Sequence, residues 1–264
     1  MAQEPAASTV ALADGEIRVL SAGAGQDVLV LHHDIGPLGW TPFHAALATR
    51  CRVHAADLPG FGDSPRVEWA RHPRDFAALM LAAARRLGLR DYLLVGLGFG
   101  GWVAAELAAF AWPELAGLVL AAPAGLRPDE GYILDQVMEE PIAYVRAGFS
   151  DEAVFAAHFP DPRERALKSR LDACRETVCR VAWKPYMYSL ELPHLLAEVR
   201  LPVTVVWGEA DAVIPPGCAD AWARALPNCT VQRLPGAGHF LDLERPERLA
   251  EIVAAGAAVL TAKE

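Results

Sequence analysis

A glycine stands where the surrounding pattern calls for a nucleophile. Residues 91–102 read Asp-Tyr-Leu-Leu-Val-Gly-Leu-Gly-Phe-Gly-Gly-Trp, which predicts a buried strand running into a helix. At that junction the spacing Gly96-x-Gly98-x-Gly100 is the frame of a nucleophile elbow, G-x-S-x-G, with glycine in place of serine. A serine there would attack a carbonyl carbon and form a covalent intermediate. Because glycine has no side chain, the sequence frames this chemistry but lacks the attacking atom.

Asp211 and His239 could do acid–base chemistry beside position 98. Asp211 follows the apolar run 202–207, and His239 closes the segment Gly-Ala-Gly-His. A histidine acts as a base through one ring nitrogen when a carboxylate holds the proton on the other. The alternative interpretations are a turn aspartate next to Pro215 and a hydrogen-bonded loop histidine.

The predicted elements would bring these residues together. Strand and helix patterns alternate along the chain, which predicts a mostly parallel sheet with helices on both faces. The sequence predicts a hairpin over 8–22, strands over 27–32, 52–57, 91–97, 115–122, 202–207 and 230–234, and helices over 40–49, 73–87, 98–110, 218–226 and 246–261. In open parallel sheets, ligands bind at the carboxyl ends of the strands. Positions 98, 211 and 239 all follow such ends.

The pattern changes after Pro123. Residues 126–198 read as helices separated by Pro and Gly, with many aromatic residues. At 264 residues the chain fits one domain with an insertion. We therefore expect a core domain of 1–125 and 199–264 and a helical cap of 126–198. Such aromatic side chains usually form a helical core, but some should also line an apolar pocket above Gly98. The expected pocket residues are His33, Trp102, Tyr144, Phe159, Trp183 and Met187.

Five motifs in this order resemble the α/β-hydrolase superfamily. They are Leu31-His32, Asp57-Leu-Pro-Gly-Phe-Gly-Asp-Ser64, Val95-Gly-Leu-Gly-Phe-Gly-Gly101, Trp207-Gly-Glu-Ala-Asp211 and Gly236-Ala-Gly-His239. The resemblance covers nearly the whole chain and implies the α/β-hydrolase fold with an inserted helical cap. It implies that Asp211 is the triad acid, His239 the base and position 98 the nucleophile. The capped subgroup includes ester hydrolases, C–C bond hydrolases, epoxide hydrolases and dehalogenases. The last two carry Asp at the elbow, so Gly98 departs from all four.

The same resemblance places an oxyanion hole at the backbone N–H groups of Phe99 and Asp34. Family members commonly carry His-Gly where this chain has His32-His33. An inward-pointing Asp34 would add negative charge where an oxyanion forms and would raise the barrier. An Asp34 that points to solvent or caps a turn is the alternative. Adjacent residues on a strand face opposite ways, so we expect no metal site at residues 32–34.

The elbow also matches a rival motif. Gly96-x-Gly98-x-x-Gly101 satisfies the dinucleotide fingerprint G-x-G-x-x-G. However, the strand before it is about the fifth in order, and the next strand is followed by no acid that could bind a ribose hydroxyl. A dinucleotide site would also give Asp211 and His239 no role. We therefore expect no cofactor.

Composition narrows the partners and the compartment. The formal net charge of −9 argues against nucleic acid and anionic membranes. The five cysteines form no C-x-x-C pair, and the start of the chain lacks the features of a secretory signal. No apolar run approaches the ~20 residues that a membrane span needs. We expect a soluble cytoplasmic protein that takes a small apolar or aromatic ligand, and a homodimer is compatible with the sequence.

Three hypotheses of function follow. The first is a hydrolase resembling ester or C–C bond hydrolases whose nucleophile is absent, through divergence or replacement. The second is a non-covalent enzyme, in which His239 and Asp211 activate water or remove a substrate proton in a lyase, isomerase or cyclase reaction. The third is a non-catalytic binding protein that keeps the pocket.

Overall fold

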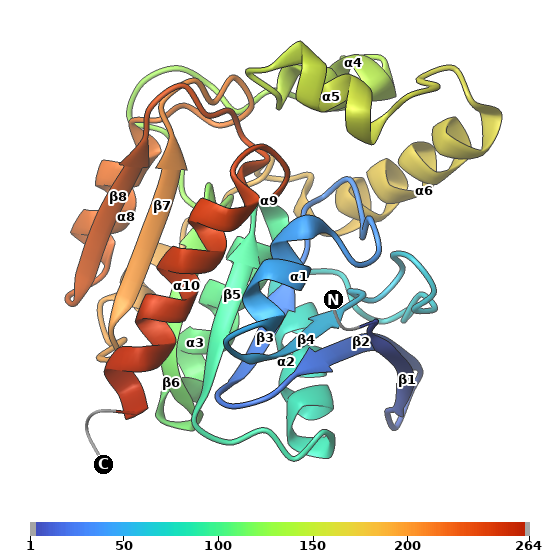
Figure 1. The fold of residues 1–264 in the computed structure, drawn as a ribbon. Coiled ribbons are helices and arrows are strands. Elements are labelled where there is room, and N and C mark those ends of the chain that lie inside the picture. The colour runs from blue at the N-terminus through green and yellow to red at the C-terminus, as the bar shows by residue number, and fades with distance from the viewer. Residues whose placement is uncertain (1–3, 262–264) are drawn as a thin grey trace.

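The computed structural model describes residues 4–261, and its strands form one eight-stranded sheet (Figure 1). The strands are β1 (Ala6–Ala11), β2 (Glu16–Gly23), β3 (Asp27–Leu31), β4 (Arg52–Ala56), β5 (Tyr92–Leu97), β6 (Leu115–Ala121), β7 (Val203–Gly208) and β8 (Cys229–Leu234). Their order across the sheet is β1-β2-β4-β3-β5-β6-β7-β8. Only β1–β2 and β2–β4 pair antiparallel. The predicted fold class, a mostly parallel sheet with helices, is confirmed.

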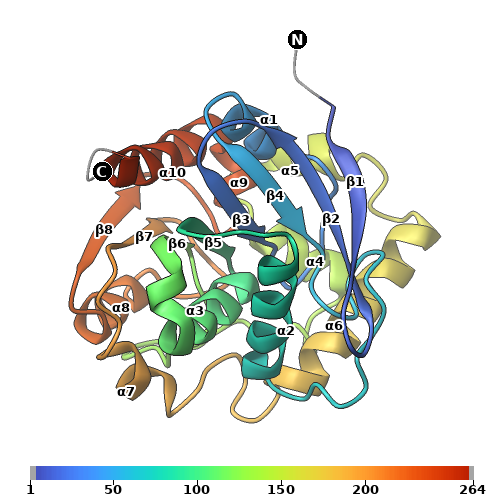
Figure 2. The same cartoon turned by 90° about the horizontal axis from the view of Figure 1, so that it is seen from below.

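Helices cover both faces of the sheet (Figure 2). One face carries α1 (Pro42–Ala48) and α10 (Pro246–Thr261), and the other carries α2 (Pro73–Arg86), α3 (Phe99–Ala111) and α8 (Cys218–Ala225). The short helix α7 (Leu192–Leu196) packs against α3 and α8, and a 3-10 turn, η1 (Trp112–Glu114), follows α3. Within residues 4–261, no helix combines the length and apolar character needed to span a bilayer.

The predicted elements agree with the observed ones to within a few residues. The expected hairpin is β1 and β2, in which Val10 pairs with Ile17 across the turn. The sequence missed α9 (Leu241–Glu244), because a four-residue helix is too short to show a helical period. This helix follows His239 directly and carries two buried carboxyl groups, Asp242 and Glu244.

The centre of the fold requires close contact between β3, β5 and α3. All six residues of β5 are buried, as expected for a strand covered on both faces. A Cβ on Gly100 would lie only 2.4 Å from the carbonyl oxygens of Leu31 and His32. The Gly100 N–H instead donates to the His32 oxygen at 3.0 Å. The glycine therefore lets the first turn of α3 lie directly against the end of β3.

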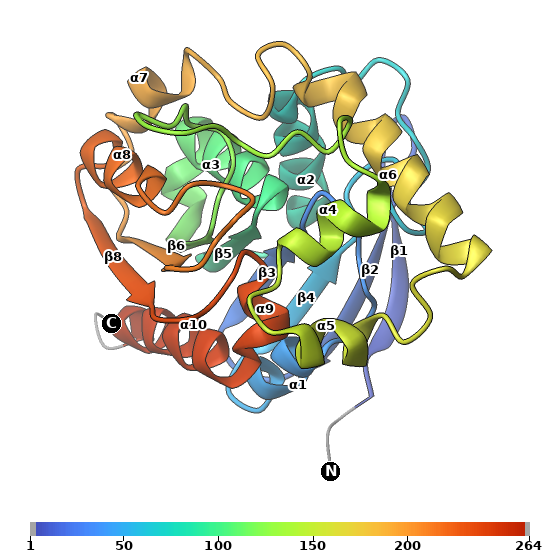
Figure 3. The same cartoon turned by 90° about the horizontal axis from the view of Figure 1, so that it is seen from above.

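Between β6 and β7 the chain leaves the sheet and forms three helices that lie over the carboxyl ends of its parallel strands (Figure 3). These inserted helices are α4 (Pro141–Ala147), α5 (Glu152–His158) and α6 (Arg165–Ala182). The carboxylates of Glu140 and Asp151 accept N–H groups in the first turns of α4 and α5. These side chains satisfy donors that a helix leaves unpaired at its start.

Two contacts tie the inserted segment to the loop that carries His239. The buried Glu244 carboxylate accepts the N–H groups of Ser150 at 2.6 Å and Asp151 at 3.0 Å, and also that of Gly238. The Gly148 carbonyl accepts the N–H of His239 at 2.8 Å. The inserted helices therefore help to position His239 as well as to cover it.

Replacing Glu244 should destabilise the protein. The Glu244→Ala change leaves three backbone N–H groups without their charged acceptor, so we expect a loss of about 2 to 4 kcal/mol in the free energy of unfolding. Urea denaturation measures it. The control is Glu251→Ala, which removes an exposed ion pair with Arg248 and should cost less than about 0.5 kcal/mol. Equal losses in the two variants would show that Glu244 does not tie the segments together.

Candidate active site

Gly98 lies at the junction of β5 and α3 in a conformation that disfavours a side chain. Its backbone has φ 51° and ψ −114°, a region in which an L-residue is strained. A Cβ on Gly98 would lie 2.5 Å from Nδ1 of His33 and 3.1 Å from Nε2 of His239. Two imidazoles therefore flank the space into which any side chain at this position would point.

The structure brings Asp211 and His239 together. Nδ1 of His239 and Oδ2 of Asp211 are 2.9 Å apart, and both side chains are buried. Oδ1 of Asp211 accepts the N–H groups of Val213 and Ile214 at 2.8 and 2.9 Å. An ionised carboxylate only accepts hydrogen bonds, so the proton lies on Nδ1 of His239. Nε2 is therefore the nitrogen that faces Gly98 as an acceptor.

The environment of His239 raises its pKa. Burial by itself lowers the pKa of His239, but the charge and hydrogen bond of Asp211, with further contributions from Asp34 and Asp242, outweigh burial and raise it. A raised pKa makes the imidazole a stronger proton acceptor when it is neutral. The arrangement suits a general base.

A second histidine–carboxylate pair lies opposite the first. Nε2 of His33 is 2.9 Å from Oδ1 of Asp242, and both side chains are buried. Burial raises the pKa of Asp242, but the charge and hydrogen bond of His33 outweigh that effect and lower it, which favours the carboxylate. His33 therefore donates from Nε2. Its Nδ1, which faces Gly98, has no hydrogen-bond partner within residues 4–261.

The sequence reasoning missed Asp242. The partners of this pair are 209 residues apart in the chain, and nothing local links them. One signal was present, because two acidic residues alternate with leucines in Leu241-Asp-Leu-Glu244, directly after His239. Acidic side chains are rarely fully buried unless they are paired. Their place in so apolar a segment indicates such pairing.

Asp34 points inward, toward the two histidines, rather than to solvent. Its side chain is buried, and its Oδ2 accepts the hydroxyl of Tyr144 on α4 at 2.6 Å. Burial, followed by the charge of Asp34, raises the pKa of Tyr144 well above its usual value, so the phenol stays a donor. In the described part of the chain, Oδ1 of Asp34 has no partner.

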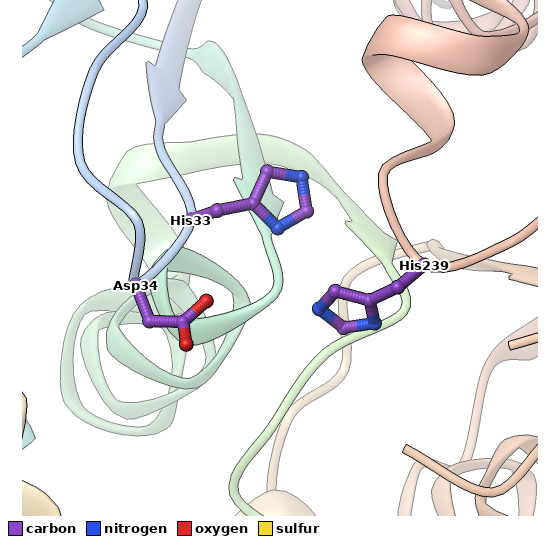
Figure 4. Close-up of side chains that lie close together, drawn as sticks. All are labelled: His33, Asp34 and His239. Atoms are coloured by element: carbon purple, nitrogen blue, oxygen red, sulfur yellow. The ribbon is translucent and has the colours of Figure 1, made fainter. Parts of the chain in front are cut away.

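The side chains of His33, Asp34 and His239 point toward one another (Figure 4), and both histidines lie next to Gly98. One potential ligand atom from each lies within 4.8 Å of those of the other two. The expectation from strand alternation is wrong here, because β3 ends at Leu31 and residues 33 and 34 lie beyond it, in a turn. A turn obeys no two-residue alternation, so neighbouring side chains can face the same way.

His32 takes no part in this cluster and instead fixes the turn. Its Nδ1 donates to the His33 carbonyl at 2.7 Å, and its Nε2 accepts the N–H of Leu58 at 3.0 Å. Burial lowers the pKa of His32 to about 4, so it stays neutral at neutral pH.

The expected oxyanion donors have no other partner. Among residues 4–261, the backbone N–H groups of Phe99 and Asp34 donate no hydrogen bond. Phe99 begins α3, where the first N–H groups have no acceptor inside the helix. Both donors are available to a ligand, and their role as an oxyanion hole remains a prediction.

The expected pocket residues are found in different places. His33 and Tyr144 are in the site. Trp102 donates to Glu106 at 3.2 Å and lines a cavity of about 410 Å³ beside Lys184 and Tyr188. The remaining three lie in the segment inserted between β6 and β7: Phe159 is stacked on Phe155, Trp183 is half-exposed beside Tyr186, and Met187 is buried with φ 58°. Whether these four contact a ligand remains a prediction.

The space around the cluster is small. A cavity of about 30 Å³ is lined in part by His33 and Asp242, and another of about 10 Å³ by Asp34 and Tyr144. A polar cavity of about 10 to 15 Å³ holds one water molecule. Each of these two cavities is therefore of a size for water, although neither is lined by Gly98 or His239.

A side chain at position 98 should compete with His33 for space. We expect Gly98→Ala to cost about 2 to 5 kcal/mol in the free energy of unfolding, from backbone strain and overpacking. In the Gly98→Ala/His33→Ala double variant the steric part disappears, which gives a favourable coupling energy of about 1 to 3 kcal/mol. Urea denaturation of the four proteins measures it.

A matched control is Gly217→Ala, where an added Cβ would meet no atom within 4 Å and φ is −62°. It should change stability by less than about 0.5 kcal/mol. A coupling energy near zero would mean that His33 does not restrict position 98.

The chain is similar to known proteins over most of its length. Residues 23–252 match the model of the alpha/beta hydrolase family. A 2-hydroxy-6-oxononadienedioate/2-hydroxy-6-oxononatrienedioate hydrolase of Burkholderia vietnamiensis is 26% identical over 252 residues, which cover 88% of this chain and 87% of the relative. The dihydrolipoyllysine-residue acetyltransferase component of the acetoin cleaving system of Cupriavidus necator is 30% identical over 258 residues, covering 92% and 67%.

Solved structures show the same fold. A serine hydrolase involved in carbazole degradation, the CarC enzyme, superposes with a TM-score of 0.77 at 21% identity, covering 97% of this chain and 99% of that one. A bacterial membrane phospholipase A superposes with a TM-score of 0.80 at 23% identity, covering 98% and 87%. By its sequence match and its fold, this chain belongs to the alpha/beta hydrolase family.

Proposed function

We propose that this protein hydrolyses a small carbonyl compound without forming a covalent enzyme intermediate. One observation carries the proposal. The space that a nucleophilic side chain at position 98 would take is flanked by two acceptor nitrogens, Nδ1 of His33 and Nε2 of His239. A water molecule has two hydrogens to donate and a lone pair left for attack. It needs less room than a serine side chain, whose Cβ would collide with His33.

The reaction follows from the position of the acceptors. The water oxygen attacks the carbonyl carbon while Nε2 of His239 takes one proton, and Asp211 stabilises the resulting imidazolium. The carbonyl electrons move to the oxygen, where the N–H groups of Phe99 and Asp34 are the available donors. When the tetrahedral intermediate collapses, the acyl bond breaks and His239 returns the proton to the leaving group. The products are a carboxylic acid and the protonated leaving group.

His33 orients the water in this proposal. Its Nδ1 accepts the second hydrogen, because Nε2 is already committed to Asp242. Both imidazoles are therefore held in one tautomer by a carboxylate. Holding a reactant in the right orientation can lower the activation barrier by several kcal/mol, up to about 7 to 11 kcal/mol.

The substrate class is a small apolar or aromatic molecule with a carbonyl group. Relatives over almost the whole chain include a hydrolase named for 2-hydroxy-6-oxononadienedioate. The inserted helices contribute an aromatic cluster next to the His239 loop, in which Phe149 lies 5.2 Å from Phe240 between ring centroids. An apolar wall beside a few polar groups is typical of small-molecule sites.

Replacing His239 should nearly abolish turnover. The wild-type protein should form no covalent adduct during turnover. We expect His239→Ala to lower kcat/KM for 2-hydroxy-6-oxodienoates or aryl esters by about 100- to 10,000-fold, because it removes the proton acceptor. Absorbance assays measure turnover. Intact mass spectrometry of quenched wild-type reactions should show the unmodified protein mass.

The control is His194→Ala, on an exposed residue of α7, which should keep wild-type activity. An acyl adduct in the quenched wild type would contradict the non-covalent mechanism. Turnover that survives in His239→Ala would contradict the assignment of the base.

Restoring a covalent nucleophile should need two changes. Gly98→Ser alone places its Cβ 2.5 Å from His33, so we expect it to react poorly with a fluorophosphonate probe. Gly98→Ser with His33→Gly provides both the hydroxyl and the space for it next to His239. We expect this double variant to be labelled at position 98 at least tenfold faster, measured by mass spectrometry.

His33→Gly alone serves as the control and should not be labelled. Equal labelling of Gly98→Ser with and without His33 would show that the histidine does not exclude a nucleophile. An unlabelled double variant that folds normally would show that position 98 is not a nucleophile position.

A further inference from the structure

We propose that Nδ1 of His33, Oδ1 of Asp34 and Nε2 of His239 form a binding site for one divalent first-row transition-metal ion. The inference rests on one part of the proposed function, the attack by water on a carbonyl carbon, but it assigns the activation of that water to the ion instead of to His239. It goes against the expectation from the sequence. We expected neighbouring side chains to point in opposite directions, as they do within a strand, but His33 and Asp34 lie beyond the end of β3.

Three acceptors face one another with no donor between them. In the described residues, Nδ1 of His33 and Oδ1 of Asp34 are buried without a hydrogen-bond partner. Nε2 of His239 likewise forms no hydrogen bond in this part of the chain, because its ring donates from Nδ1 to Asp211. A buried polar atom without a partner destabilises the folded state. Three lone pairs directed at one point are what a cation would satisfy.

The local charge also favours a cation. Asp34, Asp211 and Asp242 are three buried carboxyl groups around two imidazoles. Among residues 4–261, no Lys or Arg forms an ion pair with any of the three. A divalent cation would offset most of the negative charge that the three carboxylates carry together. Buried charges in proteins are normally paired or bound to metal.

The groups behind the ligand atoms are those of a metal site. Metal-binding histidines usually donate their other ring N–H to a carboxylate, which fixes the tautomer and raises the basicity of the ligand nitrogen. Both histidines have such a carboxylate at 2.9 Å, Asp242 for His33 and Asp211 for His239. The hydroxyl of Tyr144 holds Oδ2 of Asp34 and leaves Oδ1 free. Each proposed ligand is thus already oriented by a buried partner.

The geometry suits a small ion after modest contraction. The three ligand atoms lie within 4.8 Å of one another. Metal–nitrogen bonds of about 2.0 to 2.1 Å place neighbouring ligand atoms about 3 to 3.5 Å apart, so a separation of 4.8 Å must shorten by about 1.3 to 1.8 Å on binding. Gly98 matters here as well, because a side chain at that position would occupy the space between the two imidazoles.

The donor set indicates the class of metal. Two imidazole nitrogens and one carboxylate oxygen suit Zn²⁺ and its neighbours such as Fe²⁺ or Co²⁺, whereas Mg²⁺ and Ca²⁺ prefer oxygen ligands. Three protein ligands leave positions open for water. A metal-bound water can lose its proton to solvent near neutral pH and so supply the hydroxide that attacks the carbonyl carbon. In the ion-bound site, His239 is a ligand rather than the proton acceptor.

Cobalt binding tests the site without any substrate. We would titrate EDTA-treated full-length protein with Co²⁺ and follow its visible absorption, with Zn²⁺ stoichiometry measured by elemental analysis. We expect one ion per chain. His33→Ala and Asp34→Asn should each weaken binding at least 100-fold, and Asp242→Asn, which removes only the orienting carboxylate, by about 10- to 100-fold.

Controls separate this site from other ligands in the chain. His194→Ala should bind as wild type does, and circular dichroism should show that each variant is folded. If His33→Ala fails to fold, the more conservative Asp34→Asn carries the test. The proposal is overturned if the wild type binds no Co²⁺, if a thiolate charge-transfer band shows cysteine ligation, or if Asp34→Asn binds as tightly as wild type.

The test distinguishes failure of the metal site from failure of the proposed function. If EDTA-treated protein binds no Co²⁺ and keeps full turnover, the proposed metal site is wrong, and water activation by His239 still stands. If the protein binds one Co²⁺ per chain but hydrolyses no carbonyl substrate, the metal site is supported and the proposed reaction is wrong.

Discussion

The rest of the site depends on one steric constraint, the close approach of His33 to Gly98. An added Cβ would come within 2.5 Å of the imidazole, so this position can hold a side chain or the present His33 ring, but not both. The two residues are complementary in volume. With His33 in place, the residues around position 98 supply acceptor atoms rather than a nucleophile, which is why we propose that water attacks the substrate.

Buried carboxylates hold this arrangement in place. Asp211 and Asp242 each orient one imidazole, and Glu244 joins the inserted segment to the His239 loop. Burying a carboxylate is unfavourable unless hydrogen bonds satisfy it. Each carboxylate therefore holds its hydrogen-bond partners in place. The short helix α9 carries two of these carboxylates directly after His239. The loop that carries His239, the helix α9 and the inserted segment are thereby connected through a few hydrogen bonds to carboxylates.

Local patterns predicted the sheet and the strand–helix junction at Gly98 well. Apolar runs and glycine turns identified β5, α3 and their junction because each signal is confined to a short stretch of sequence. Asp211 and His239 were found through short motifs at strand ends. Asp242 was not, because its partner His33 is 209 residues away and the contact exists only after folding. The direction of Asp34 was left open, and the alternation rule applied to its neighbours fails where β3 ends.

The sequence by itself determined the order of elements, the absence of a side chain at position 98 and the choice of Asp211 and His239 as a candidate acid–base pair. These follow from residue type and local spacing. Only the tertiary structure decided that His33 fills the space beside Gly98 and that Asp34 turns inward to meet Tyr144. Their directions are set by a turn beyond β3 and by packing against α4 and α9, and such long-range contacts leave no mark in the local pattern.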